Sequence, residues 1–196
     1  MDRRRLLMTA AAGAGAVSVP AASRAGTHRR AGLAILTVSG AIGKTNRGPL
    51  DPALDQLMVK HGAGFERAFE FDAAMLAGLP AVTIAPTLEY DGRVHRLSGP
   101  LLSSVIEAVG VAPSASVILV LRALDGYTIA LSLADARRDR MIVADRIDGR
   151  PMGIGGLGPL WAIVDADHVA AFKDKPLKER FALCPWGLYA IEVKPA

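Results

Sequence analysis

Short runs that alternate between apolar and polar residues dominate the chain from residue 33 onwards. Such runs, when rich in β-branched residues and bounded by Gly, Pro or Asp, are typical of half-buried strands. Three Asp-Gly dipeptides fall between or just after these runs, where they favour tight turns. The pattern therefore predicts strands at 33–40, 67–71, 82–90, 93–97, 117–124, 127–133, 141–146, 160–164 and 188–193.

Helical spacing of apolar residues occurs in only a few short segments. Asp51 and Pro52 predict the start of a helix over 51–61, because Asp caps helices and Pro suits the first helical position. Asp72 is placed to cap a second helix over 73–79, and further helical patterns cover 100–109 and 134–138. The sequence thus predicts an α+β fold, with a β-rich mixed sheet or barrel-like arrangement and short helices.

The first 25 residues have the layout of an export signal. Arg3, Arg4 and Arg5 precede an apolar stretch over 6–19, and small residues follow at 23 and 25. The arginine pair before an apolar pair resembles a twin-arginine signal, although an ordinary secretory signal with a basic start is the alternative. We expect an export signal at 1–25, a flexible mature N-terminus at 26–32, one domain over 33–196, and a periplasmic location.

Charge and cysteine content narrow the possible partners. The chain has a net charge of +4, but residues 1–25 hold four Arg and one Asp, which leaves +1 for the rest. No basic surface is left to favour nucleic acid, and nothing after residue 25 is long and apolar enough to span a membrane. Cys184 is the single cysteine, so no disulfide can form within the chain. A small ligand or a periplasmic protein is the expected partner.

An ordered series of short motifs runs through the domain. It comprises LTVSG at 36–40, GPLL at 99–102, EAVG at 107–110, ALDGYT at 123–128, LADA at 133–136, DGRPM at 148–152, GPLW at 158–161 and YAIEV at 189–193. This series resembles the oxidoreductase molybdopterin-binding domain family, whose fold is that of sulfite oxidase. The resemblance covers most of 33–193. It implies a mixed α+β domain that, in active members, holds a molybdenum–pterin cofactor through one cysteine thiolate on a loop before the Gly-Pro-Leu helix.

The chain departs from that family at the metal ligand. The matching loop, 85–92, contains no cysteine. Cys184 is expected to be a small buried hydrophobe, since it would reach the pocket only if the fold carried Pro185 and Trp186 across it. No metal site and no catalytic residue are predicted.

The resemblance nevertheless implies a pocket. We expect the loop at 87–91 and the turn at 125–127 to face one cavity, with basic residues near its rim that could meet the pterin phosphate. The alternative for the basic residues is an exposed strand edge. The candidate pocket residues are Thr87, Arg93, His95, Arg96, Asp125 and Tyr127.

Three functions from different classes remain open at this point. The first is an exported module that binds a ligand or a partner and has no molybdenum catalysis. The second is a molybdopterin-dependent oxidoreductase that holds its cofactor without a cysteine ligand. A purely structural accessory subunit is a third. The glycine-rich stretch 153–158 precedes Pro159 and a predicted strand rather than a helix, which disfavours a dinucleotide site there.

Replacing Arg3 and Arg4 by Lys tests the export route. Lys keeps the charge but removes the guanidinium pair that the twin-arginine receptor reads. We expect the precursor to accumulate inside the cell, as measured by cell fractionation and immunoblotting. Unchanged export of this variant would exclude the twin-arginine route.

Overall fold

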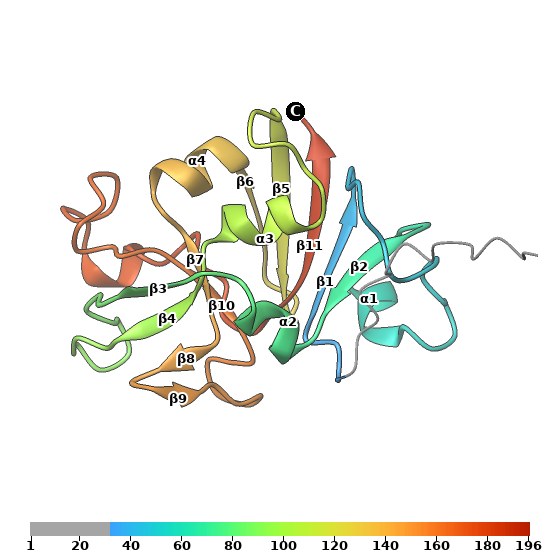
Figure 1. Cartoon of the computed structure of the whole chain (residues 1–196). Helices are drawn as coiled ribbons and strands as arrows, with labels where there is room; N and C mark the ends of the chain where they lie inside the picture. The colour runs from blue at the N-terminus through green and yellow to red at the C-terminus, as the bar shows by residue number, and fades with distance from the viewer. Residues whose placement is uncertain (1–31) are drawn as a thin grey trace, which may run out of the picture.

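The computed structural model describes residues 32–196 and contains three open sheets (Figure 1). The largest sheet has the strand order β2-β1-β11-β5-β6. Strands β1 and β11, the first and last along the described chain, pair in parallel, and the other neighbours are antiparallel. The strands of this sheet are β1 (Leu36–Gly40), β2 (Ala68–Phe71), β5 (Val117–Ala123), β6 (Thr128–Ser132) and β11 (Leu188–Pro195).

The remaining strands form a four-stranded sheet, of order β3-β4-β8-β9, and the antiparallel pair of β7 and β10. In Figure 1 the four-stranded sheet lies to the left of the five-stranded one, with β7 and β10 between them. The strands are β3 (Ala81–Ile84), β4 (Leu97–Pro100), β7 (Ile142–Ala144), β8 (Arg146–Ile147), β9 (Arg150–Pro151) and β10 (Trp161–Ile163).

The helices are short and begin at capping residues in two cases. Asp72 accepts a hydrogen bond from the Met75 N–H at the start of α2, as the sequence predicts. Ser132 caps α4 in the same way, through the N–H of Asp135. The described helices are α1 (Gln56–Lys60), α2 (Ala73–Ala77), α3 (Leu102–Ala108), α4 (Leu133–Arg138) and a 3₁₀ turn at Leu177–Glu179. None of the helices within 32–196 has the length and apolar character needed to cross a bilayer.

The predicted α+β class with short helices is confirmed, but the barrel-like arrangement is not found in the described residues. Strands β2 and β6 are the edges of the five-stranded sheet and do not pair with each other, so this sheet does not close on itself. The export signal predicted at 1–25, and residues 26–31 of the predicted flexible N-terminus, lie outside the described residues.

Several predicted elements have different limits in the structure. The strands expected at 82–90 and 93–97 are largely a loop, with one isolated bridge between Thr87 and Val94. Pro86 lies in this stretch and lacks the N–H that a strand ladder requires. The first helix begins at Gln56 rather than after Asp51, whose carboxylate instead accepts hydrogen bonds from Ala53 and Leu54 in the preceding turn.

Burial along β5 shows how the five-stranded sheet faces the core. Alternate residues of this strand are buried and the intervening ones are partly exposed, as expected for a sheet with one apolar face. The core continues into the smaller sheets, where Leu97, Ile142 and Trp161 are fully buried. Strands β4 and β7 approach closely at Gly99, where a Cβ atom would lie 2.0 Å from the carbonyl oxygen of Val143.

Gly99→Ala should therefore destabilise the domain by at least about 2 kcal/mol, because backbone atoms rather than a flexible side chain occupy the space. Urea unfolding followed by circular dichroism measures this change. Gly48→Ala is the matched control, since nothing lies within 4 Å of its added Cβ. Equal stability of the two variants would contradict the close packing of β4 on β7.

Candidate functional site

An aromatic pocket lies where three segments that are distant in the sequence meet. Its volume is about 260 Å³. One wall comes from the loop between β3 and β4, a second from the turn between β5 and β6, and a third from the segment before β11. The residues that define the aromatic pocket are Glu89, Tyr90, Asp125, Tyr127, Lys178, Phe181, Ala182, Cys184, Pro185 and Trp186.

The first wall is a tight turn at the tip of the β3–β4 loop. The Leu88 N–H donates to the carbonyl oxygen of Arg93 at 2.8 Å, and Gly92 has a φ of +68°. A residue with a side chain rarely adopts that φ, so glycine suits this position. The turn presents Glu89 and Tyr90 to the pocket.

Asp167 ties this loop to the third wall. Its carboxylate accepts hydrogen bonds from the Thr87 N–H at 2.7 Å and the Thr87 hydroxyl at 2.8 Å, and it pairs with the Arg180 guanidinium at 2.7 Å. Burial alone would raise the pKa of Asp167, but the Thr87 hydrogen bonds and the Arg180 charge outweigh it and hold the pKa below its usual value. The carboxylate is therefore ionised at neutral pH and joins two loops about the pocket.

The second wall is the Asp-Gly turn after β5. The Asp125 side chain accepts a hydrogen bond from the Tyr127 N–H at 2.9 Å, and Gly126 has a φ of +90°. The Tyr127 hydroxyl donates to the Ala182 carbonyl at 2.6 Å, which connects the second wall to the third. The ring of Tyr127 is held in place by its own hydroxyl.

The third wall is fixed to β10 by Trp161. The indole N–H of this fully buried residue donates to the Cys184 carbonyl at 2.8 Å, and the Ala162 N–H donates to the Pro185 carbonyl at 3.1 Å. The Trp161 ring centroid lies 6.2 Å from that of Phe181 and 6.3 Å from that of Tyr90. The Trp161 indole thus lies beside one ring of the first wall, Tyr90, and one ring of the third wall, Phe181.

Burial divides the pocket into a base and a mouth. Phe181, Cys184 and Pro185 are buried and Trp186 is partly buried, whereas Tyr90 and Tyr127 are exposed. Aromatic rings therefore line both the base and the entrance.

The pocket has a negative electrostatic character. Burial raises the pKa of Tyr90, and the charges of Glu89 and Asp125 raise it further. These two carboxylates disfavour a negative charge on the Tyr90 hydroxyl and would favour a positive charge nearby. Lys178 is the only cationic residue among those that line the pocket, against two carboxylates.

Cys184 lies in the pocket wall but is 3% exposed. Burial raises the pKa of its thiol to about 12, so the neutral thiol predominates at neutral pH. The burial of Cys184 agrees with the expectation that it is a small buried hydrophobe. The fold also carries Pro185 and Trp186 along the pocket, which was the condition for Cys184 to reach it.

The structure brings together only some of the predicted site residues. Asp125 and Tyr127 line the aromatic pocket opposite Glu89 and Tyr90, and Thr87 supports it through Asp167. The basic residues Arg93, His95 and Arg96 are not among its lining residues.

The predicted basic residues lie outside the aromatic pocket. His95 lies between two carboxylates, with Nδ1 2.7 Å from Asp148 and Nε2 2.9 Å from Asp91, and these contacts raise its pKa. His95 lines a separate cavity of about 680 Å³ beside the β8–β9 hairpin. Arg93 and Arg96 are exposed.

Glu89 and Tyr90 belong to the loop at 87–91 that was expected to face the cavity, although neither was named as a candidate pocket residue, whereas Lys178 and Phe181 lie in a segment that was not predicted to line it. The last two lie in the irregular stretch 166–186, where neither periodicity nor a motif indicates which side chains face inward. Across residues 32–196 there is no group of three or more His, Cys, Asp or Glu side chains arranged to hold a metal ion.

No protein-family model matches the chain, and no curated protein matches it.

Asp167→Ala should lower the free energy of unfolding by roughly 1–3 kcal/mol, because it leaves Thr87 and Arg180 without their shared acceptor. The contribution of the carboxylate is present above its unfolded pKa and is lost as pH falls through its lowered folded pKa. Denaturant unfolding at pH 7 and at pH 3 measures both effects, and the difference between wild type and variant should shrink at the lower pH.

Asp174→Ala is the matched control for that experiment. Asp174 is exposed in the same long loop, and its side chain makes no hydrogen bond or ion pair with another described residue. If both variants lose the same stability at pH 7, the Thr87–Asp167–Arg180 contact does not hold the loops together.

Proposed function

We propose that this protein is an exported ligand-binding domain of sulfite oxidase-like descent that binds a small organic cation in the aromatic pocket. The observation that carries the proposal is the lining of the pocket, in which four aromatic side chains surround a space flanked by Glu89 and Asp125. Its periplasmic location follows from the predicted export signal, and its descent from the ordered motifs.

The residues of the pocket do not fit a molybdenum–pterin cofactor. A metal-bonding cysteine must be a thiolate, but Cys184 is buried and the pKa of its thiol is raised to about 12. Only Lys178 is available for a terminal phosphate, since Arg93 and Arg96 lie outside the lining. The volume of about 260 Å³ is also below the range of about 300–1,000 Å³ that holds drug-sized ligands.

A small cation suits the same features. The electron-rich faces of Tyr and Trp rings attract cations, and this attraction is strongest where water is excluded. Glu89 and Asp125 add negative charge to the lining, and their charges add to the effect of burial in raising the pKa of Tyr90. Because Lys178 offsets one of these charges, the lining has one carboxylate in excess, which matches a monovalent ligand.

Intrinsic fluorescence provides a direct measurement of binding. The chain has two tryptophans, Trp161 and Trp186, and they lie under and beside the pocket. Titration with choline should change their emission and saturate. The neutral isostere 3,3-dimethyl-1-butanol should bind at least about tenfold more weakly, because it has the same shape without the charge.

Variants of the carboxylates separate this proposal from non-specific binding. Glu89→Gln and Asp125→Asn should each weaken choline binding several-fold, while Glu66→Gln, on an exposed loop before β2, should leave it unchanged. Equal affinity for choline and the neutral isostere would contradict the cation proposal. Stoichiometric molybdenum in protein purified from a molybdenum-competent host would overturn it in favour of the oxidoreductase.

A further inference from the structure

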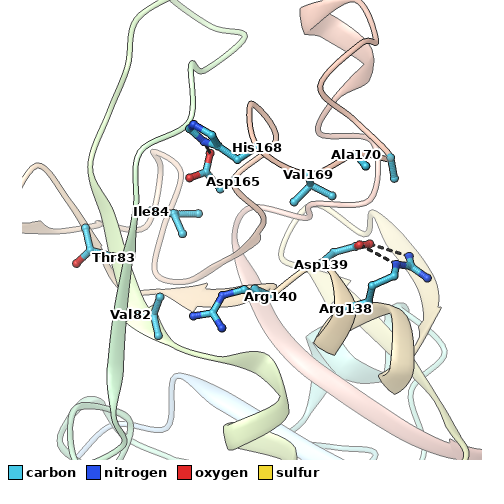
Figure 2. A pocket seen from close by; sticks show the side chains of 11 residues that line it. Val82, Thr83, Ile84, Arg138, Asp139, Arg140, Asp165, His168, Val169 and Ala170 are labelled. Carbon is cyan, nitrogen blue, oxygen red and sulfur yellow. Dashed lines mark hydrogen bonds and ion pairs between the residues drawn. The ribbon is translucent and has the colours of Figure 1, made fainter.

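A third cavity, of about 640 Å³, runs beside β3 (Figure 2). We call it the β3 groove. Its sides are β3, the end of α4 with the residues that follow, and the loop at 165–171. No residue of the aromatic pocket lines it, so its role is independent of the function proposed above.

The groove lies along an open sheet edge. Strand β3 is the terminal strand of its sheet, and Thr83 is paired with Ser98 of β4. The Ser98 carbonyl accepts a hydrogen bond from the Asp145 N–H at 3.0 Å, on the side of β4 that faces β8. In a strand, the N–H and C=O of one residue point to the same side, so Ser98 makes no main-chain hydrogen bond to β3. Its partner Thr83 therefore directs its own N–H and C=O away from β4, towards the open edge of the sheet.

The side chains of β3 alternate about this edge. Val82 and Ile84 point into the groove and Thr83 points away from it, while Val169 lies on the opposite side (Figure 2). Such an edge offers unpaired main-chain groups together with apolar sites spaced for alternate side chains of an added strand.

A free guanidinium lies at one end of the groove. Arg140, which follows α4 with a left-handed φ of 51°, directs its side chain towards Val82 (Figure 2). Within residues 32–196 this side chain makes no hydrogen bond or ion pair, whereas the neighbouring Arg138 pairs with Asp135 and Asp139. Arg140 is therefore available for an external carboxylate.

From these features we propose that the β3 groove binds an extended peptide that ends in a free carboxylate. The peptide adds to β3 as an antiparallel strand and exchanges hydrogen bonds with the N–H and C=O of Thr83. Alternate apolar side chains pack on Val82 and Ile84. Arg140 lies near the beginning of β3, which is where the C-terminus of an antiparallel strand arrives, and it binds the terminal carboxylate.

The probe is a fluorescein-labelled hexapeptide of alternating serine and valine with a free C-terminal carboxylate, followed by fluorescence anisotropy. We expect saturable binding that weakens about tenfold or more when the C-terminus is amidated. Arg140→Gln should weaken binding of the free acid to the level of the amide and leave binding of the amide unchanged. Arg93→Gln is the matched control on an exposed arginine away from the groove.

Thr83→Pro tests the main-chain pairing. Proline removes the outward N–H and is tolerated on sheet edges where that group faces solvent, whereas Thr83→Val retains the donor. We expect Thr83→Pro to abolish binding and Thr83→Val to preserve it. If Thr83→Pro fails to fold, methylation of single peptide amides tests the same contact on the wild-type protein, and one methylated position should lose binding.

Several outcomes would overturn the proposal. These are absence of binding at millimolar peptide, binding that Thr83→Pro and peptide methylation both leave unchanged, or equal binding of the free acid and the amide. Full competition by hexanoate that is insensitive to Thr83→Pro would show that the groove takes a small carboxylic acid instead of a peptide.

Discussion

The hydrogen bond from the buried Trp161 indole to the Cys184 carbonyl is the contact on which the candidate site depends. Trp161 belongs to β10, which is paired to β7 in the core, so its ring has little freedom to move. Phe181 and Tyr90 pack near that ring, and the chain from Cys184 to Trp186 follows β10. A long loop with almost no secondary structure is thereby held against a rigid strand, and it becomes a defined pocket wall.

The first and second walls are shaped by local turns, and side-chain contacts then join each of them to the third wall. Asp167 connects the Thr87 loop to Arg180, and the Tyr127 hydroxyl connects the Asp-Gly turn to Ala182. These contacts are polar and partly exposed, whereas the base of the pocket is apolar and buried. The pocket thus has an apolar, buried base and a polar, exposed mouth flanked by Tyr90 and Tyr127, an arrangement that would suit the proposed small ligand.

Much of the fold could be predicted from the sequence, because period-two patterns and turn dipeptides are local signals. The strands at 117–124 and 127–133, the Asp-Gly turns and the Asp72 cap were all predicted and are found. The order of strands in the sheets depends on long-range packing, so the barrel-like arrangement was wrong. For the site, the meeting of the β3–β4 loop with the Asp125 turn was expected. The wall from Phe181 to Trp186 is instead fixed by long-range contacts with β10 and Tyr127, which no local pattern encodes.

A crystal structure of the protein with choline tests the central claim most directly. The account predicts the trimethylammonium group in the aromatic pocket, within about 6 Å of the ring centroids of Tyr90, Tyr127 or Trp186 and facing Glu89 and Asp125. Choline bound elsewhere, with the pocket empty at saturating ligand, would contradict the account. So would a molybdenum–pterin in that pocket with Cys184 bonded to the metal.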